Sequence, residues 1–112
     1  MIARASLEAA TRYAKEREAF GHPIADYQAV KLKIAQMAMR IDAARLLNIN
    51  ASAKTQAEGR ASVESAMAKI FASETCIDAS LQAMLIHGGY GYTTEFAVER
   101  FYRDAPLSLI HI

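Results

Sequence analysis

Two long stretches of helical apolar spacing, separated by a single glycine turn, constrain this chain more than any other feature. The first is expected to begin near Asp26 as its N-cap and to place apolar residues every three or four positions until Glu58-Gly59. The second is expected to start near Ser62, where Ser-Val-Glu-Ser can cap the first turn, and to end at the Gly88-Gly89 pair. Two such helices joined by a tight turn must lie antiparallel.

Two shorter helices are expected to cover this pair. One spans about residues 2–18, is rich in alanine and has no capping residue before it, and the other runs from near Thr94 to Pro106, which stops it. No strand pattern and no internal repeat competes with this assignment. At 53% hydrophobic residues, a chain of 112 residues can bury one small core. The sequence therefore predicts an all-α fold, an antiparallel up-and-down helical bundle.

Charge and cysteine content narrow the classes of partner. The formal net charge of +1, with both signs interspersed, predicts no nucleic acid and no anionic membrane surface as partner. No apolar run reaches the roughly 18 residues of a membrane span, so no membrane insertion is expected. The single Cys76 has no neighbouring ligand cluster, which predicts a reducing compartment and no structural metal. We expect the cytoplasm or an organelle matrix.

A break between the first two helices is the first candidate site. Gly21 can adopt a backbone conformation closed to other residues, and Pro23 fixes its own φ, so the chain is expected to reverse sharply after Phe20. Arg17, one turn before the reversal, is placed to reach an anion. Taken alone, Arg17 is more often a surface ion-pair partner.

A second break, from His87 to Tyr92, is the other candidate. Its paired glycines allow backbone N–H groups to approach a flat or anionic ligand without a Cβ in the way, and its tyrosines supply ring faces. Taken alone, a glycine C-cap followed by an aromatic turn is the more ordinary interpretation. His87 is likewise more often a packed or solvated histidine than a catalyst.

Taken in order, the motifs of the chain form a recognisable series. They are Tyr13-Ala14-Lys15-Glu16-Arg17-Glu18-Ala19-Phe20-Gly21-His22-Pro23-Ile24, Gln28, Ala35-Gln36-Met37, Ala43-Ala44-Arg45, Ala68-Lys69, His87-Gly88-Gly89-Tyr90-Gly91-Tyr92, Glu99-Arg100 and Arg103-Asp104-Ala105. This series resembles the C-terminal helical domain of acyl-CoA dehydrogenases over residues 5–106, so residues 1–106 are expected to form that domain.

The resemblance implies a cofactor, partners and an assembly. Members of that family are FAD-dependent enzymes that oxidise acyl-CoA thioesters to 2-enoyl-CoA and pass electrons to an electron-transferring flavoprotein. Their subunits add an N-terminal helical domain and a middle β-domain to this bundle and assemble as tetramers, each a dimer of dimers. The resemblance implies that the bundle contributes both breaks to the FAD site of a neighbouring subunit.

The same resemblance implies roles for single residues. Arg17 would meet the FAD pyrophosphate, because a guanidinium can bind phosphate oxygens in a bidentate way. The other implied cofactor contacts are Glu18, Ala19 and Phe20 on the same wall, Tyr27 and Gln28 at the next helix start, and Leu85, Ile86, His87, Gly88 and Gly89 on the adenosine side. Leu85 stands where many members have Gln, which removes one side-chain hydrogen bond.

A second departure lies at the end of the chain. The resemblance places Ile112 where many members carry the Glu that removes the substrate α-proton, so no catalytic residue is assigned. Some relatives place this base on the first helix of the domain, upstream of Met1. Residues 107–112 match the translation of a transposon end used to prepare sequencing libraries. We interpret them as a non-native tail, with a natural apolar C-terminus as the alternative.

Three functions are compatible with the sequence. The first is a piece of an acyl-CoA dehydrogenase, expected to be inactive by itself and prone to self-association through exposed apolar stripes. The second is a flavin-dependent oxygenase or nitroalkane oxidase with the same bundle. The third is a non-catalytic helical interaction module, which bundle-forming periodicity alone would support.

Overall fold

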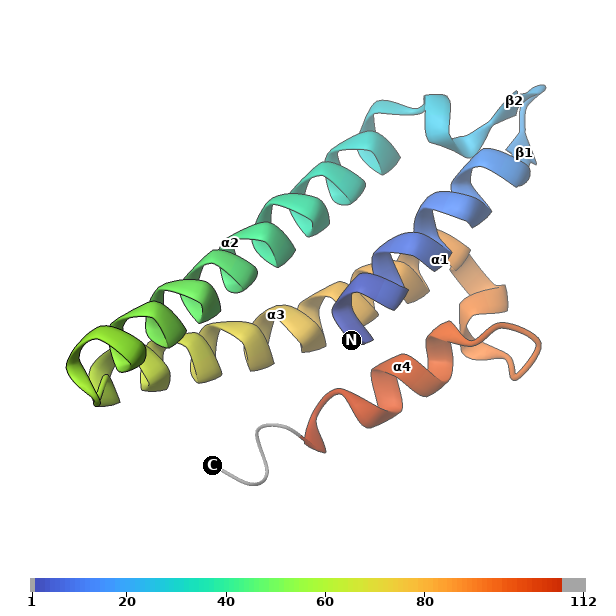
Figure 1. The fold of residues 1–112 in the computed structure, drawn as a ribbon. Coiled ribbons are helices and arrows are strands. Elements are labelled where there is room, and N and C mark those ends of the chain that lie inside the picture. The colour runs from blue at the N-terminus through green and yellow to red at the C-terminus, as the bar shows by residue number, and fades with distance from the viewer. Residues whose placement is uncertain (1, 108–112) are drawn as a thin grey trace.

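The computed structural model describes residues 2–107, which are almost entirely helical (Figure 1). In chain order the elements are α1 (Ile2–Glu16), β1 (Glu18–Ala19), β2 (His22–Pro23), η1 (Ile24–Asp26), α2 (Gln28–Glu58), α3 (Ser62–His87), η2 (Gly88–Tyr92) and α4 (Val98–Asp104). The predicted all-α antiparallel bundle is confirmed. None of the helices in these residues is long and apolar enough to cross a membrane.

The α2–α3 hairpin is the scaffold of the molecule and turns at Gly59. Gly59 has φ +78°, a left-handed conformation that suits glycine, and its N–H donates to the carbonyl of Thr55 at 2.8 Å. Across the turn, Lys54 Nζ donates to Glu64 Oε1 at 2.5 Å. This hydrogen bond lowers the pKa of the Glu64 carboxyl.

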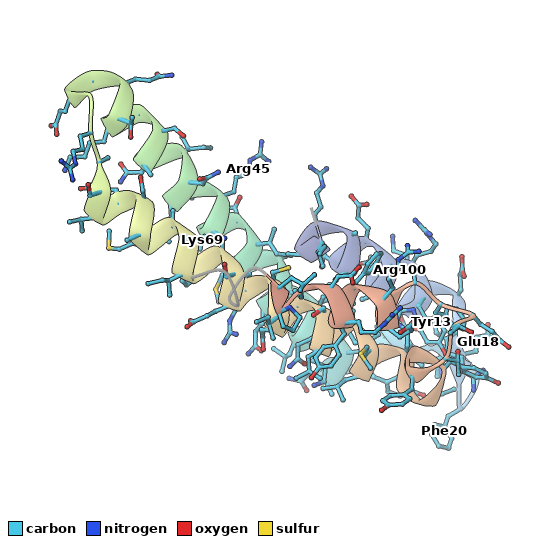
Figure 2. The ribbon with its side chains drawn as sticks, turned by 90° about the horizontal axis from the view of Figure 1, so that it is seen from below. Tyr13, Glu18, Phe20, Arg45, Lys69 and Arg100 are labelled. Atoms are coloured by element: carbon cyan, nitrogen blue, oxygen red, sulfur yellow. The ribbon has the colours of Figure 1, made fainter. Side chains whose placement is uncertain are left out.

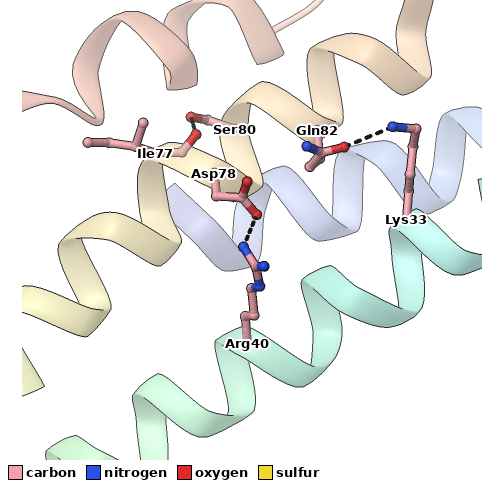
Figure 3. A network of polar contacts seen from close by, with 6 residues as sticks. All are labelled: Lys33, Arg40, Ile77, Asp78, Ser80 and Gln82. Carbon is pink, nitrogen blue, oxygen red and sulfur yellow. Dashed lines mark hydrogen bonds and ion pairs between the residues drawn. The ribbon is translucent and has the colours of Figure 1, made fainter.

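Polar contacts between the facing sides of α2 and α3 set the register of the two helices (Figure 3). Arg40 Nη1 donates to Asp78 Oδ2 at 2.8 Å, and Lys33 Nζ donates to Gln82 Oε1 at 3.1 Å. Each pair joins residues about 40 to 50 positions apart in the chain, so both contacts depend on the antiparallel alignment.

The buried core lies at one end of this hairpin, where α1 and α4 cover it (Figure 1). Its buried members are small except for three, and small side chains allow the helices to approach closely. They are Ala10, Ala14, Met37, Ala79, Ala83, Ile86 and Val98. The rest of the hairpin extends beyond α1 and α4, giving a molecule of 56 × 25 × 15 Å. This part of the hairpin carries exposed apolar side chains, among them Leu46, Ile49, Val63, Met67 and Ile70.

Several helix ends differ from the sequence prediction. The expected N-cap Asp26 lies in η1, while Tyr27 precedes α2 in an extended conformation and makes no side-chain cap bond. Pro23, with φ −56°, leads into the tight η1 turn, which includes Asp26, so the N-cap of α2 lies one residue later, at Tyr27. Ser62 is the first residue of α3 rather than its cap, because Ala61 holds that position.

The two short helices are also shorter than expected. α1 ends at Glu16 because the chain after Arg17 turns into the hairpin of β1 and β2, which the sequence did not predict. α4 begins at Val98 rather than near Thr94, because Thr93 is extended and its N–H and hydroxyl both donate to the carbonyl of Tyr90.

Candidate functional site

The two chain breaks line one pocket, although about 70 residues separate them in the sequence. The pocket has a volume of about 510 Å³, within the usual range for small-molecule sites. Its lining comes from the end of α1, from η1 and from the junction of α3 and η2: Tyr13, Arg17, Ile24, Ile86, His87, Gly88, Gly89, Tyr90 and Thr93.

Arg17 supplies the positive charge of the pocket. Its N–H donates to the carbonyl of Tyr13 at 2.8 Å, so its backbone continues the last turn of α1. The guanidinium carbon lies 5.9 Å from the centroid of the Tyr90 ring, which is cation–π distance and joins the two breaks directly. Among residues 2–107, no carboxylate forms an ion pair with Arg17. Its guanidinium therefore keeps its hydrogen-bonding capacity for an anion.

In the hairpin after Arg17, the aromatic residue Phe20 has an unfavourable backbone conformation. Its strands pair Glu18 with Pro23 and Ala19 with His22, leaving Phe20 and Gly21 as a two-residue turn. Both turn residues have positive φ, 56° and 84°, as a type I′ turn requires. Phe20 is 96% exposed and points away from the helices in Figure 2. An exposed aromatic ring held on a strained turn is available to a ligand or partner.

His87 is a packed histidine, as its more ordinary interpretation predicts. Its ring is buried and stacks on Tyr13, with centroids 4.2 Å apart and 22° between the planes. Its Nδ1 lies 2.8 Å from the carbonyl oxygen of Ala83, so the neutral ring donates from Nδ1. Burial lowers the pKa of His87, which keeps the imidazole neutral. It shapes the wall of the pocket without adding a charge.

The glycines of the second break have two different roles. A Cβ added at Gly88 or Gly89 would meet nothing within 4 Å, so the backbone there is open to a ligand. Gly88 also has φ +64°, which favours glycine. A Cβ at Gly91 would lie 2.6 Å from the carbonyl oxygen of Met84, so Gly91 is needed for packing.

The structure brings together five of the residues predicted for the site: Arg17, Ile86, His87, Gly88 and Gly89. Glu18, Ala19, Phe20, Tyr27, Gln28 and Leu85 lie outside the pocket lining. The side chains of Glu18, Phe20, Gln28 and Leu85 are exposed, whereas the Tyr27 hydroxyl donates to the carbonyl of Ala19 at 2.6 Å. Ile112 and the end of the proposed tail lie outside the described residues.

Sequence reasoning missed three lining residues, Tyr13, Ile24 and Thr93, whereas it named Tyr90 as one of the ring faces of the second break. Tyr13 lies one helical turn before Arg17, and this spacing on α1 was the available signal for it. Ile24 and Thr93 lie at the ends of the breaks, but nothing in their residue types separates a pocket wall from an ordinary turn.

The chain matches the family model described as acyl-CoA dehydrogenase, C-terminal domain, over residues 1–111. Curated relatives include the caffeyl-CoA reductase–Etf complex subunit CarC of Acetobacterium woodii, which is 46% identical over 98% of this chain and 29% of its own length. The mitochondrial short-chain specific acyl-CoA dehydrogenase of Rattus norvegicus is 44% identical over 98% of this chain and 27% of its own length.

Solved structures agree with these relatives. The butyryl-CoA dehydrogenase of Megasphaera elsdenii superposes with a TM-score of 0.93 and 41% identity, covering 98% of this chain and 29% of that structure. The chain thus spans somewhat more than a quarter of the length of the relatives it matches. Its sequence, its bundle and the family match agree, and the chain belongs to the acyl-CoA dehydrogenase family as a C-terminal domain.

Proposed function

We propose that this chain acts as the C-terminal domain of an FAD-dependent acyl-CoA dehydrogenase that oxidises acyl-CoA thioesters to 2-enoyl-CoA. The observation that carries the proposal is the meeting of Arg17 with the Gly88-Gly89 pair at one pocket. A cation beside Cβ-free backbone suits a ligand that combines an anion with a flat ring, and a dinucleotide is such a ligand.

The residues present fit part of FAD. Arg17 has no ion-pair partner within residues 2–107 and would bind the pyrophosphate through bidentate hydrogen bonds. The open backbone at Gly88 and Gly89 would accept the adenosine side, next to Ile86 and His87. When bound, the flavin supplies the hydride acceptor of the reaction, and this chain supplies binding and orientation.

The remaining predicted contacts stay part of the proposal. Glu18 and Phe20 in the β1–β2 hairpin and Gln28 at the start of α2 are exposed. Leu85 is exposed near the end of α3. A cofactor held by another subunit could reach all four side chains. We propose that the exposed apolar side chains of the α2–α3 hairpin pack in a homo-oligomer, a dimer of dimers.

Electron transfer and location follow from the relatives only by analogy. One relative is named as a subunit of a reductase–Etf complex, and we propose an electron-transferring flavoprotein as the redox partner of the whole enzyme. Another relative is mitochondrial, and we propose the bacterial cytoplasm or the mitochondrial matrix as the location.

FAD retention in the longer protein that contains this domain tests the proposal. Arg17→Ala removes the charge, and Gly89→Ala adds a methyl group to the open backbone at a position where a Cβ meets nothing within 4 Å. Arg17→Ala should raise the FAD dissociation constant at least about tenfold, because hydrogen bonds to charged groups contribute about 1.5–3 kcal/mol. The Gly89 variant should also raise it, because its side chain keeps the ligand away from the backbone. Arg12→Ala is the matched control, since Arg12 is an exposed arginine of α1 outside the pocket lining.

Two results would decide against the proposal. Unchanged flavin content in both variants would show that the pocket does not hold the cofactor. An equal loss of flavin in Arg12→Ala would show that any surface cation of α1 has the same effect.

A further inference from the structure

We propose that the hydroxyl of Tyr27 is a positioning group that holds the Phe20-Gly21 turn in its left-handed conformation. The hydrogen bond from Tyr27 to the residue before the turn lies within this chain and does not depend on any ligand. Its consequence for a ligand rests on the proposed function, because Phe20 belongs to the turn and Arg17 directly precedes the hairpin.

The turn needs a stabilising contact from outside itself. A non-glycine residue in the left-handed region costs roughly 1–2 kcal/mol, and Phe has no polar side chain to compensate locally. Phe20 is 96% exposed, so burial of its ring does not offset this cost. A hairpin with two residues in each strand adds little stability of its own.

The hairpin backbone can supply only part of that contact. Pro23, opposite Glu18, has no N–H to donate to the ladder. The N–H of Ile24 donates to the carbonyl of Arg17 at 2.8 Å and closes the base of the hairpin. Next to the turn, the Ala19–His22 pair of the ladder reaches the peptide before Phe20, but this ladder has only two residues in each strand.

The Tyr27 hydroxyl acts at that peptide. It donates to the carbonyl oxygen of Ala19, the residue directly before Phe20, at 2.6 Å. Among residues 2–107, no other side chain forms a hydrogen bond to the backbone of residues 17–23. The orientation of the Ala19 carbonyl depends on the φ and ψ angles on either side, so fixing it limits the conformations open to Phe20.

Tyr27 is itself held firmly. Its N–H donates to the carbonyl of Ile24 at 3.1 Å, and its carbonyl accepts from the N–H of Lys31 at 3.0 Å. Tyr27 is the N-cap of α2, which has 31 residues and is the longest helix among residues 2–107, so its ring is anchored at the start of that helix. The hydroxyl therefore connects the turn to the start of α2.

Amide exchange and NMR couplings of this chain test the role of the hydroxyl. Tyr27→Phe removes the hydroxyl and keeps the ring. It should lower the left-handed population of Phe20, read from its three-bond HN–Hα coupling, and speed exchange of the Ile24 amide about threefold to tenfold, the effect of one lost hydrogen bond. Tyr92→Phe, which removes an exposed tyrosine hydroxyl elsewhere, should change neither value.

A second substitution separates positioning from general packing. Asn adopts positive φ at lower cost than Phe, and Asn-Gly favours a type I′ turn. In a Phe20→Asn background, Tyr27→Phe should therefore change Ile24 exchange less than twofold. The proposal is overturned if Tyr27→Phe has the same effect in both backgrounds, or if it leaves the coupling and the exchange unchanged with Phe20 present.

FAD retention in the longer protein links the turn to the ligand. With a working FAD site, Tyr27→Phe should weaken retention about threefold to tenfold, as a loosened turn predicts. Loss of flavin in Arg17→Ala with no change in Tyr27→Phe would overturn the link between the turn and the ligand and leave the proposed function intact. A loosened turn with no flavin loss in either variant would overturn the proposed function and leave the role of Tyr27 in the turn intact.

Discussion

The imidazole of His87 lies on the phenol ring of Tyr13, with centroids 4.2 Å apart and planes only 22° from parallel. Phe96 meets both rings edge-on, at 5.5 Å from Tyr13 and 5.2 Å from His87. This cluster joins the last turn of α3 to α1 and to the segment before α4. Because Tyr13 and His87 also line the pocket, the stability of the bundle and the shape of the site depend on the same contact.

Stability should depend on pH through His87. Burial lowers its pKa in the folded chain, so the unfolded chain binds more protons when the pH is below about 6.5, the ordinary value for histidine. The stabilisation that the neutral His87 ring gives to the folded chain should be complete above that pH. It should be lost as the pH falls from there toward the pKa of His87 in the folded chain. Urea unfolding at several pH values measures it.

The matched variant for this pH effect is His87→Phe, which keeps an aromatic ring and removes the titrating group. His87→Phe should make the free energy of unfolding depend less on pH below about pH 6.5. His22→Gln, at an exposed histidine of β2, should leave it unchanged. A wild-type slope that persists in His87→Phe would assign the effect to another group.

Tyr13→Ala should destabilise the chain by about 1–3 kcal/mol. The change removes a partly buried ring with two aromatic partners, and the estimate lies below the 3–5 kcal/mol of a fully buried aromatic residue. Tyr92→Ala, at a tyrosine that is 83% exposed, should stay within about 0.5 kcal/mol. Chemical denaturation of both variants makes the comparison, and equal losses would argue against the aromatic cluster.

Met37→Ala should cost about 2–5 kcal/mol, because Met37 is among the largest fully buried side chains and is only 1% exposed. Met39, two positions later on α2, is 64% exposed, and Met39→Ala should change stability by less than about 0.5 kcal/mol. The free energy of unfolding in urea measures both. Similar values for the two would mean that α2 presents a different face to the core.

Gly91→Ala should destabilise the fold by about 1–3 kcal/mol, because its Cβ would lie 2.6 Å from the backbone oxygen of Met84, which cannot move easily. Gly89→Ala should leave stability nearly unchanged, since its Cβ would meet open space. The melting temperatures of the two variants check this difference. A larger loss for Gly89→Ala would reverse the roles assigned to the two glycines.

The ion pair of Arg40 and Asp78 should contribute about 0.2–1 kcal/mol, because both side chains keep substantial exposure, 48% and 34%. A double-mutant cycle with Arg40→Ala and Asp78→Ala isolates that energy, and added salt should reduce it. A coupling energy of zero would mean that the pair serves alignment of α2 and α3 without stabilising it.

The sequence alone predicted most of the fold. Apolar residues every three or four positions and the glycine at position 59 indicate two long antiparallel helices, and both are present in α2 and α3. The motif series likewise indicated the family, which the comparisons confirm. These features depend on local spacing and residue order, which can be read along the chain.

The helix ends and the pocket depended on contacts that no local pattern contains. The η1 turn includes Asp26, so the N-cap of α2 is Tyr27 rather than Asp26, and the Tyr27 hydroxyl donates to the carbonyl of Ala19 in the preceding hairpin. The approach of Arg17 to Tyr90 requires α1 to pack against the end of α3, two elements far apart in the sequence. Helical periodicity determines which face of a helix is apolar, but only tertiary packing decides which distant residues that face brings together.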